Sequence, residues 1–175
     1  FMIDTHAHLD HVPDIENALT RAAAAGVTDV IAVSTTLAAI RKNLELKKTC
    51  SALRIHVAFG VHPGEIKVEE LEETFEFIRA NITQATAIGE TGLDYWYKWA
   101  RKDEDEKKKQ RDCFEKHLEL AREFDLPIVI HSRGAWEDCL KMTWSFGIKK
   151  ALFHWYSGPV DVMERILTAG FYVSC

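Results

Sequence analysis

Long apolar runs and paired cysteines are what this sequence of 175 residues lacks. No apolar stretch approaches the ~18–20 residues that a membrane-spanning helix needs, so we expect no membrane partner. The four cysteines have wide, irregular spacings and no Cys-x-x-Cys pair. This pattern argues against a zinc ribbon or a disulfide scaffold and indicates reduced thiols in a cytoplasmic protein.

Positive charge is also in short supply, with 22 Lys and Arg against 27 Asp and Glu and a net charge of −5. An acidic chain argues against a broad, non-specific nucleic-acid surface, but not against a small site that handles phosphates through metal ions. With 47% hydrophobic and 28% charged residues, the composition is typical of a soluble globular protein and excludes collagen-like and disordered chains. We expect residues 1–175 to form one domain.

The chain alternates between short apolar runs of strand character and segments with helical spacing. Runs such as 30–33 and 128–130 are apolar on both faces, which is typical of a parallel sheet covered by helices. The predicted strands are Met2–Thr5, Asp29–Ser34, Ile55–Gly60, Ala85–Gly89, Pro127–Ile130, Ala151–Phe153 and Phe171–Ser174. This alternation fits either an open doubly wound sheet or a (β/α)8 barrel, which normally takes ~250 residues.

Polar side chains stand at the carboxyl ends of four predicted strands. His6 and His8 are two residues apart, so on a strand they point to one side and can bind one metal ion. Glu90, His131 and His154 end the fourth, fifth and sixth strands. Because parallel α/β sheets and barrels build their sites at this edge, the five side chains predict a metal site. Five ligands exceed the need of one tetrahedral ion, whereas two ions ~3.5–4 Å apart, bridged by Glu90, would use them all.

Five motifs are spread along the whole sequence. They are the segments 4–10 (DTHAHLD), 60–63 (GVHP), 89–95 (GETGLDY), 127–133 (PIVIHSR) and 154–158 (HWYSG). Together, in this order, they resemble the TatD family of metal-dependent deoxyribonucleases, within the amidohydrolase superfamily. Gln110, Phe114 and Ala121 also fall where that family's helix before the fifth strand has its pattern.

The resemblance implies a TIM-type (β/α)8 barrel that holds two divalent metal ions. By the family's pattern, His6 and His8 hold the first ion, His131 and His154 hold the second, and Glu90 bridges the two as the catalytic carboxylate. The identity of the ions stays open between Mg²⁺, Mn²⁺ and Zn²⁺, because imidazole ligands favour transition metals while phosphate chemistry often uses Mg²⁺ or Mn²⁺.

The reaction implied by the resemblance is hydrolysis of phosphodiester bonds in DNA, typically the exonucleolytic trimming of single strands. One ion would lower the pKa of the attacking water, and the other would stabilise the leaving oxygen. His62 and Arg133 are expected at the same rim as substrate-binding residues. Arg133 would grip a phosphate through parallel hydrogen bonds, and His62 would position phosphate or water.

One part of the family's pattern has no counterpart in this sequence. The family carries a further ligating Asp, which also acts on the attacking water, at the end of the eighth strand, and the sequence ends in the seventh. We therefore expect about seven strands, with the last βα unit missing, in a fragment of a longer protein or a shortened relative. Two further hypotheses stay open: a hydrolase of C–N or ester bonds, and a catalytically impaired metal-binding protein.

A histidine and an aromatic cluster outside the ligand set have separate predictions. His117 lies on an amphipathic helical segment and is expected at the surface. The aromatic residues Tyr95, Trp96, Tyr97 and Trp99 come shortly after Glu90. They would either stack on single-stranded bases, since aromatic faces bind bases without sequence preference, or pack within their own loop.

Overall fold

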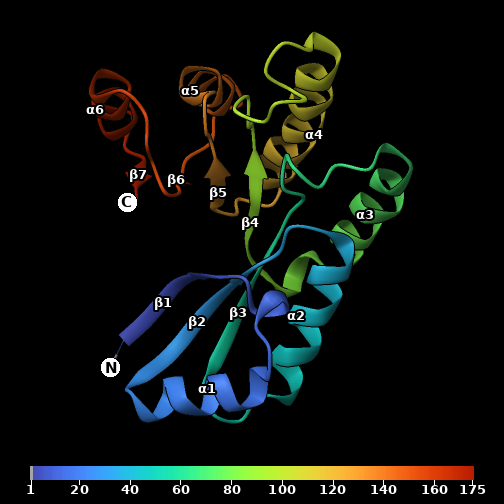
Figure 1. Cartoon of the computed structure of the whole chain (residues 1–175), viewed down its shortest axis with the longest axis vertical. Helices are drawn as coiled ribbons and strands as arrows, with labels where there is room; N and C mark the ends of the chain where they lie inside the picture. The colour runs from blue at the N-terminus through green and yellow to red at the C-terminus, as the bar shows by residue number, and fades with distance from the viewer. Residues whose placement is uncertain (1) are drawn as a thin grey trace.

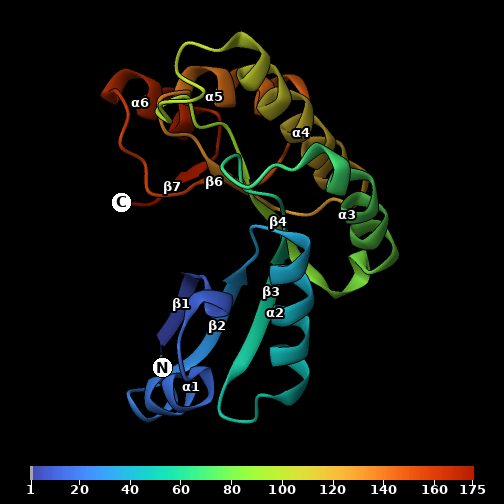
Figure 2. The same ribbon diagram turned by 45° about the vertical axis from the view of Figure 1, so that its right-hand side comes forward.

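The computed structural model describes residues 2–175, in which one sheet curls toward itself with helices along its outer face (Figures 1 and 2). Within these residues, seven parallel strands follow one another across the sheet in chain order. The strands are β1 (Met2–Ala7), β2 (Val27–Val33), β3 (Arg54–Phe59), β4 (Ala85–Gly92), β5 (Ile128–His131), β6 (Ala151–Phe153) and β7 (Tyr172–Val173). Each overlaps one of the predicted apolar runs, so the predicted barrel-type succession of about seven strands is confirmed.

Six α-helices in the same residues make the crossovers between parallel strands. They are α1 (Ile15–Ala24), α2 (Leu37–Thr49), α3 (Val68–Ala80), α4 (Glu104–Glu123), α5 (Trp136–Ser145) and α6 (Val160–Thr168), with short 3-10 helices η1 (Leu9–His11) and η2 (Ile82–Gln84). Side-chain caps fix two of the helix starts, since Thr36 accepts a hydrogen bond from the Ala39 amide and Asp103 accepts from the amides of Asp105 and Glu106. None of the helices in residues 2–175 is long and apolar enough to cross a lipid bilayer.

The two faces of the sheet carry separate apolar layers. Alternate strand residues such as Val57 and Phe59 pack with helix residues such as Ile40 and Leu118 in the large outer core. The residues between them point into the curl and form a second, smaller cluster. Its buried members are Val33, Ala58, Ala87 and Val129. The curl turns the carboxyl ends of distant strands toward one another, and the polar side chains of the site lie at these ends.

His117 corrects the prediction of a surface residue, because its side chain is fully buried. It lies three residues after Phe114 and four before Ala121, and all three are on the buried face of α4. The ring is neutral and fully hydrogen-bonded: Nδ1–H donates to the Cys113 carbonyl (2.8 Å), and Nε2 accepts from the Val61 amide (3.1 Å). Burial lowers the pKa of His117 to about 4. His117 therefore ties α4 to the loop after β3, one residue before His62.

Candidate metal centre

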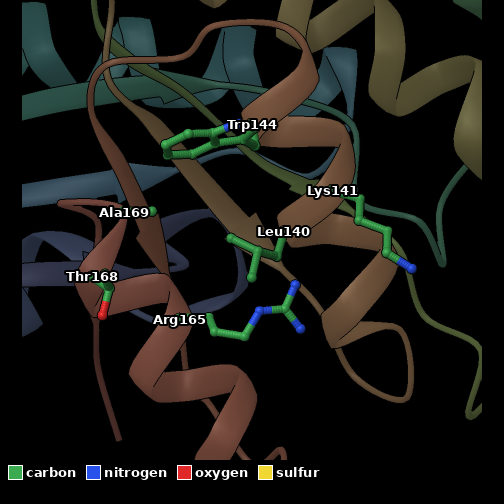
Figure 3. A pocket seen from close by; sticks show the side chains of 6 residues that line it. All are labelled: Leu140, Lys141, Trp144, Arg165, Thr168 and Ala169. Atoms are coloured by element: carbon green, nitrogen blue, oxygen red, sulfur yellow. The ribbon is translucent and has the colours of Figure 1, made fainter.

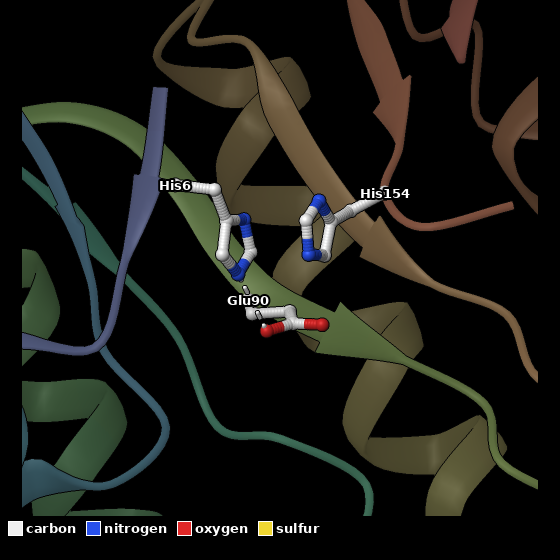
Figure 4. Close-up of side chains that lie close together, drawn as sticks. All are labelled: His6, Glu90 and His154. Atoms are coloured by element: carbon white, nitrogen blue, oxygen red, sulfur yellow. Dashed lines mark ion pairs between the residues drawn. The ribbon is translucent and has the colours of Figure 1, made fainter. Parts of the chain in front are cut away.

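Side chains from three separate strands meet at the carboxyl edge of the sheet (Figure 4). His6 comes from β1, Glu90 from β4, and His154 directly follows β6. The rings of His6 and His154 are stacked, with centroids 3.4 Å apart and an angle of 6° between their planes. Since β1 and β6 are not neighbours in the sheet, this contact exists only because the sheet curls.

The first group of ligand atoms lies around one oxygen of Glu90. Glu90 Oε2 is 3.2 Å from His6 Nε2 and 3.5 Å from His8 Nε2, and these two nitrogens are 3.4 Å apart. Ligands ~2.0–2.1 Å from a tetrahedral ion lie about 3.3 Å from one another, so the triangle has the size of a coordination site. Within residues 2–175, Nδ1 of His6 and Nδ1 of His8 are buried without a hydrogen-bond partner, so no protein group fixes either ring from the side away from Glu90. These residues fit a metal ion.

The second group lies around the other oxygen of the same carboxylate. Glu90 Oε1 is 3.2 Å from His131 Nδ1, and the ring of His62 packs edge-on against His131 with centroids 4.4 Å apart. Potential ligand atoms of His62, Glu90 and His131 all lie within 4.8 Å of one another, as do those of His6, Glu90 and His154. The structure therefore brings all five predicted ligands together, but His154 lies beside His6, and His131 lies beside His62.

The protonation states of most of these groups suit cation binding. Burial opposes the charged form of Glu90, but hydrogen bonds from His131 and His6 outweigh it and hold the pKa of the carboxyl well below its ordinary value. Burial lowers the pKa of His62 and of His154 to about 4. Metal ions bind neutral imidazoles and ionised carboxylates. For His131, burial lowers the pKa, but hydrogen bonds to Asp94 and Glu90 raise it above its ordinary value, so a cation there competes with a proton.

Asp94 is a site residue to which the sequence analysis gave no role. Its buried carboxylate oxygen Oδ2 is 2.8 Å from His131 Nε2 and 2.9 Å from Arg133 Nε. The buried Gln110 holds Asp94 in place, since its amide group accepts from the Asp94 N–H (2.7 Å) and donates to the Asp94 carbonyl (3.1 Å). A carboxylate behind a metal-binding histidine fixes its ring and tautomer. Its signal in the sequence was a carboxylate inside the GETGLDY motif.

Ser174, just after β7, has a similar role behind His154. Its Oγ accepts a hydrogen bond from the Trp155 amide (3.1 Å) and lies 3.1 Å from His154 Nδ1. The serine oxygen can accept from Nδ1–H as well, and this pairing leaves the lone pair of His154 on Nε2. This tautomer has Nε2 available as a metal ligand.

The two predicted substrate-binding residues lie beside the second group. His62 Nδ1 accepts a hydrogen bond from the Gly64 amide (3.0 Å), so the proton of the neutral ring is on Nε2. Arg133 contacts the Asp94 carboxylate through Nε and Nη2, and Nη1 takes no part in this ion pair. The Arg133 side chain is 44% exposed. Both side chains therefore have an N–H group left to donate.

Comparison with known proteins agrees with this geometry. A family model described as TatD related DNase matches residues 3–175. A metal-dependent hydrolase of Buchnera aphidicola is 33% identical over 100% of this chain and 69% of its own length. A Danio rerio protein whose name describes a candidate deoxyribonuclease is 31% identical over 98% of this chain and 68% of its own length.

Solved structures show the same relationship. A TatD homologue from Escherichia coli matches with a TM-score of 0.83 and 26% identity, over 98% of this chain and 66% of that one. A hydrolase of the TatD family from Entamoeba histolytica matches with a TM-score of 0.82 and 27% identity, over 98% of this chain and 64% of that one. The chain thus spans about two thirds of the length of these relatives. The resemblance found in the motifs is confirmed, and the chain belongs to the TatD-related DNase family of metal-dependent hydrolases.

Proposed function

We propose that this protein hydrolyses phosphodiester bonds of DNA, trimming single strands with water activated at two divalent metal ions. Membership of the family makes the chain a metal-dependent hydrolase, and the proposal adds the DNA substrate, the preference for single strands and the two ions. The ions would be held by His6, His8, Glu90, His131 and His154, and residues 1–175 would act as one hydrolase domain.

The observation that carries the proposal is that the two carboxylate oxygens of Glu90 face different histidines. One oxygen of this buried carboxylate faces His6 and His8, and the other faces His131. A carboxylate with imidazole nitrogens at both of its oxygens is the arrangement expected of a bridging ligand in a two-metal site. A single tetrahedral ion at His6 and His8 would leave His131 without a role.

The residues around Glu90 supply the remaining chemistry. Divalent cations would supply positive charge for the phosphate and increase the acidity of the attacking water. His62 would donate Nε2–H to a phosphate oxygen or to water, because Nδ1 is committed to the Gly64 amide. Arg133 would donate Nη1–H to a phosphate oxygen, while its bonds to Asp94 hold the guanidinium in place. The low pKa of Glu90 keeps the carboxylate ionised at neutral pH.

Calorimetric titration of Mn²⁺ into metal-stripped protein, followed by an assay on end-labelled oligonucleotides, tests this proposal. We expect two ions per chain, loss of binding in Glu90→Ala, and faster cleavage of single than of double strands. Exposed Glu119→Ala on α4 is the matched control. One ion per chain would contradict the two-metal part of the proposal.

The two other hypotheses make different predictions in the same experiments. A hydrolase of C–N or ester bonds would leave the oligonucleotides intact and cleave amide or carboxylic ester substrates in a Glu90-dependent way. A catalytically impaired relative would bind Mn²⁺ through the same residues and turn over neither class of substrate. Either result would replace the DNA assignment.

A further inference from the structure

A groove of about 540 Å³ lies beside the metal centre, between the loop after β3 and the loop after β4. The start of α3 forms one wall, and Trp99 with the start of α4 forms the other. Nothing in the proposed hydrolysis of a phosphate uses this groove. Its volume is that of an ordinary small-molecule site.

The groove adjoins residues around the metal centre at two points. Gly64 lines the groove, donates to His62, and lies so close to Tyr97 that an added Cβ would be 2.6 Å from the Tyr97 hydroxyl. Gln110 lines it as well, and its amide group holds both backbone groups of Asp94. A substrate whose phosphate reaches His62 therefore has its neighbouring groups at the mouth of the groove.

A stack of flat groups leads from the metal centre to the groove. Arg133, held by Asp94, lies over the ring of Tyr97 at 5.0 Å from its centroid. Tyr97 in turn stacks on Trp99, with centroids 5.0 Å apart and 13° between the planes. Trp99 keeps 47% of its surface exposed and lines the groove, so the end of the stack is accessible from the groove.

The charges of the groove suit an uncharged ring better than a phosphate chain. Its two lysines are paired, Lys109 with Glu106 (2.6 Å) and Lys67 with Glu70 (2.9 Å). The other charged lining residues, Glu69 and Asp103, are acidic. Phosphate would be repelled here, while Pro63, Ile66 and Val68 offer apolar contact.

We propose that this groove is a nucleobase subsite, in which Trp99 stacks on a base of a single-stranded substrate next to the phosphate under attack. The inference rests on the proposed function. It requires an unpaired strand, because a base inside a duplex has no exposed face for the indole. Of the two sequence-based assignments for the aromatic residues, stacking applies to Trp99, while Tyr97 packs within the stack.

The test compares two fluorescently labelled strands of equal length, one of thymidylate and one of abasic deoxyribose phosphate, by anisotropy with Ca²⁺ as the ion. We expect Trp99→Ala to weaken binding of the thymidylate strand roughly 5- to 100-fold, with little change for the abasic strand. Trp99→Phe, which keeps a stacking face, should restore most of the affinity.

Trp144→Ala is the matched control. Trp144 is 64% exposed and lines a separate hollow of about 420 Å³ with Leu140 and Arg165 of α5 and α6 (Figure 3). This hollow lies at the carboxyl ends of the helices, away from the carboxyl ends of the strands. We expect Trp144→Ala to bind both strands like the wild type.

The outcomes separate the inference from the function on which it rests. If the wild type binds the thymidylate strand and Trp99→Ala binds it equally well, the groove is not a base subsite, and the proposed function stands. Equal binding of the thymidylate and abasic strands by the wild type overturns the inference in the same way. If the wild type binds neither strand while it still binds Mn²⁺, the DNA assignment fails and the base subsite fails with it.

Discussion

The carboxylate of Asp94 lies 2.8 Å from Nε2 of His131, while Nδ1 of the same ring faces Glu90 at 3.2 Å. His131 is thus held between two carboxylates, one of which belongs to the metal centre and one of which fixes the ring from behind. The pKa of Asp94 is lowered: burial raises it, but hydrogen bonds from His131 and Arg133 more than offset that effect.

Asp94→Asn should weaken Mn²⁺ binding about 10- to 100-fold, the usual effect of losing the partner behind a metal-binding histidine. The amide keeps an acceptor oxygen but loses the charge that faces His131 and Arg133. Calorimetric titration of metal-stripped protein measures the effect. Asp112→Asn, which breaks only the surface pair with Lys108, is the control, and equal affinities in both variants would contradict the role given to Asp94.

Ser174→Ala should free the ring of His154 to change tautomer, because Nδ1 loses its acceptor. We expect Mn²⁺ affinity to fall about tenfold, the lower end of the range for such partners. Long-range ¹⁵N–¹H NMR of the histidine rings reports the tautomer directly. The prediction is wrong if His154 carries its proton on Nδ1 equally in the variant and the wild type.

Gly92→Ala should destabilise the protein and disturb His131. A Cβ at Gly92 would overlap the His131 carbonyl oxygen, and the φ of +138° is rarely adopted by other residues. The backbone conformation alone costs about 1–3 kcal/mol, and the overlap adds to this cost. Gly147→Ala is the control, since its φ is +67° with open space around the Cβ. Urea unfolding should give a clearly lower midpoint for Gly92→Ala than for Gly147→Ala.

Acid should destabilise the fold through His117. In the unfolded chain this side chain takes up a proton near pH 6.5, but burial delays protonation in the native state to about pH 4. The unfolded state therefore binds more protons between these values. The stability contributed by neutral His117 is fully present above pH 6.5 and is lost as the pH falls toward 4, by about 3 kcal/mol.

The variant His117→Gln isolates this contribution, because the histidines of the metal centre titrate in both proteins. The difference in free energy of unfolding between wild type and variant, measured in urea at pH 7.0, 5.5 and 4.5, should shrink as the pH falls. A difference independent of pH would show that His117 does not titrate in this way.

The sequence predicted the strands well because each is a short apolar run, and four of these runs have a polar side chain of the site at the carboxyl end. That rule depends only on local pattern and on the common edge of parallel strands. It placed Glu90 and His131 at the site, and the structure brings these side chains within 3.2 Å of each other.

Contacts between distant segments could not be predicted in this way. Asp94 meets His131 because the end of β4 and the end of β5 lie side by side, and no local pattern specifies which polar atoms then touch. His154 stacks on His6 rather than lying beside His131, since the curvature of the whole sheet decides which strand ends meet. His117 was misassigned because histidine was treated as polar, although its spacing from Phe114 already placed it on the buried face of α4.

The strand order has a consequence for synthesis on the ribosome. His6 emerges with β1, whereas its stacking partner His154 emerges later, after β6. A nascent chain that has not yet released β6 already carries His6, His8, Glu90 and His131 but lacks His154. Contacts of such large sequence separation also form slowly, because a long loop must close before they contribute. The complete metal centre therefore assembles only after β6 and His154 have been made, when most of the helix-covered sheet described here already exists.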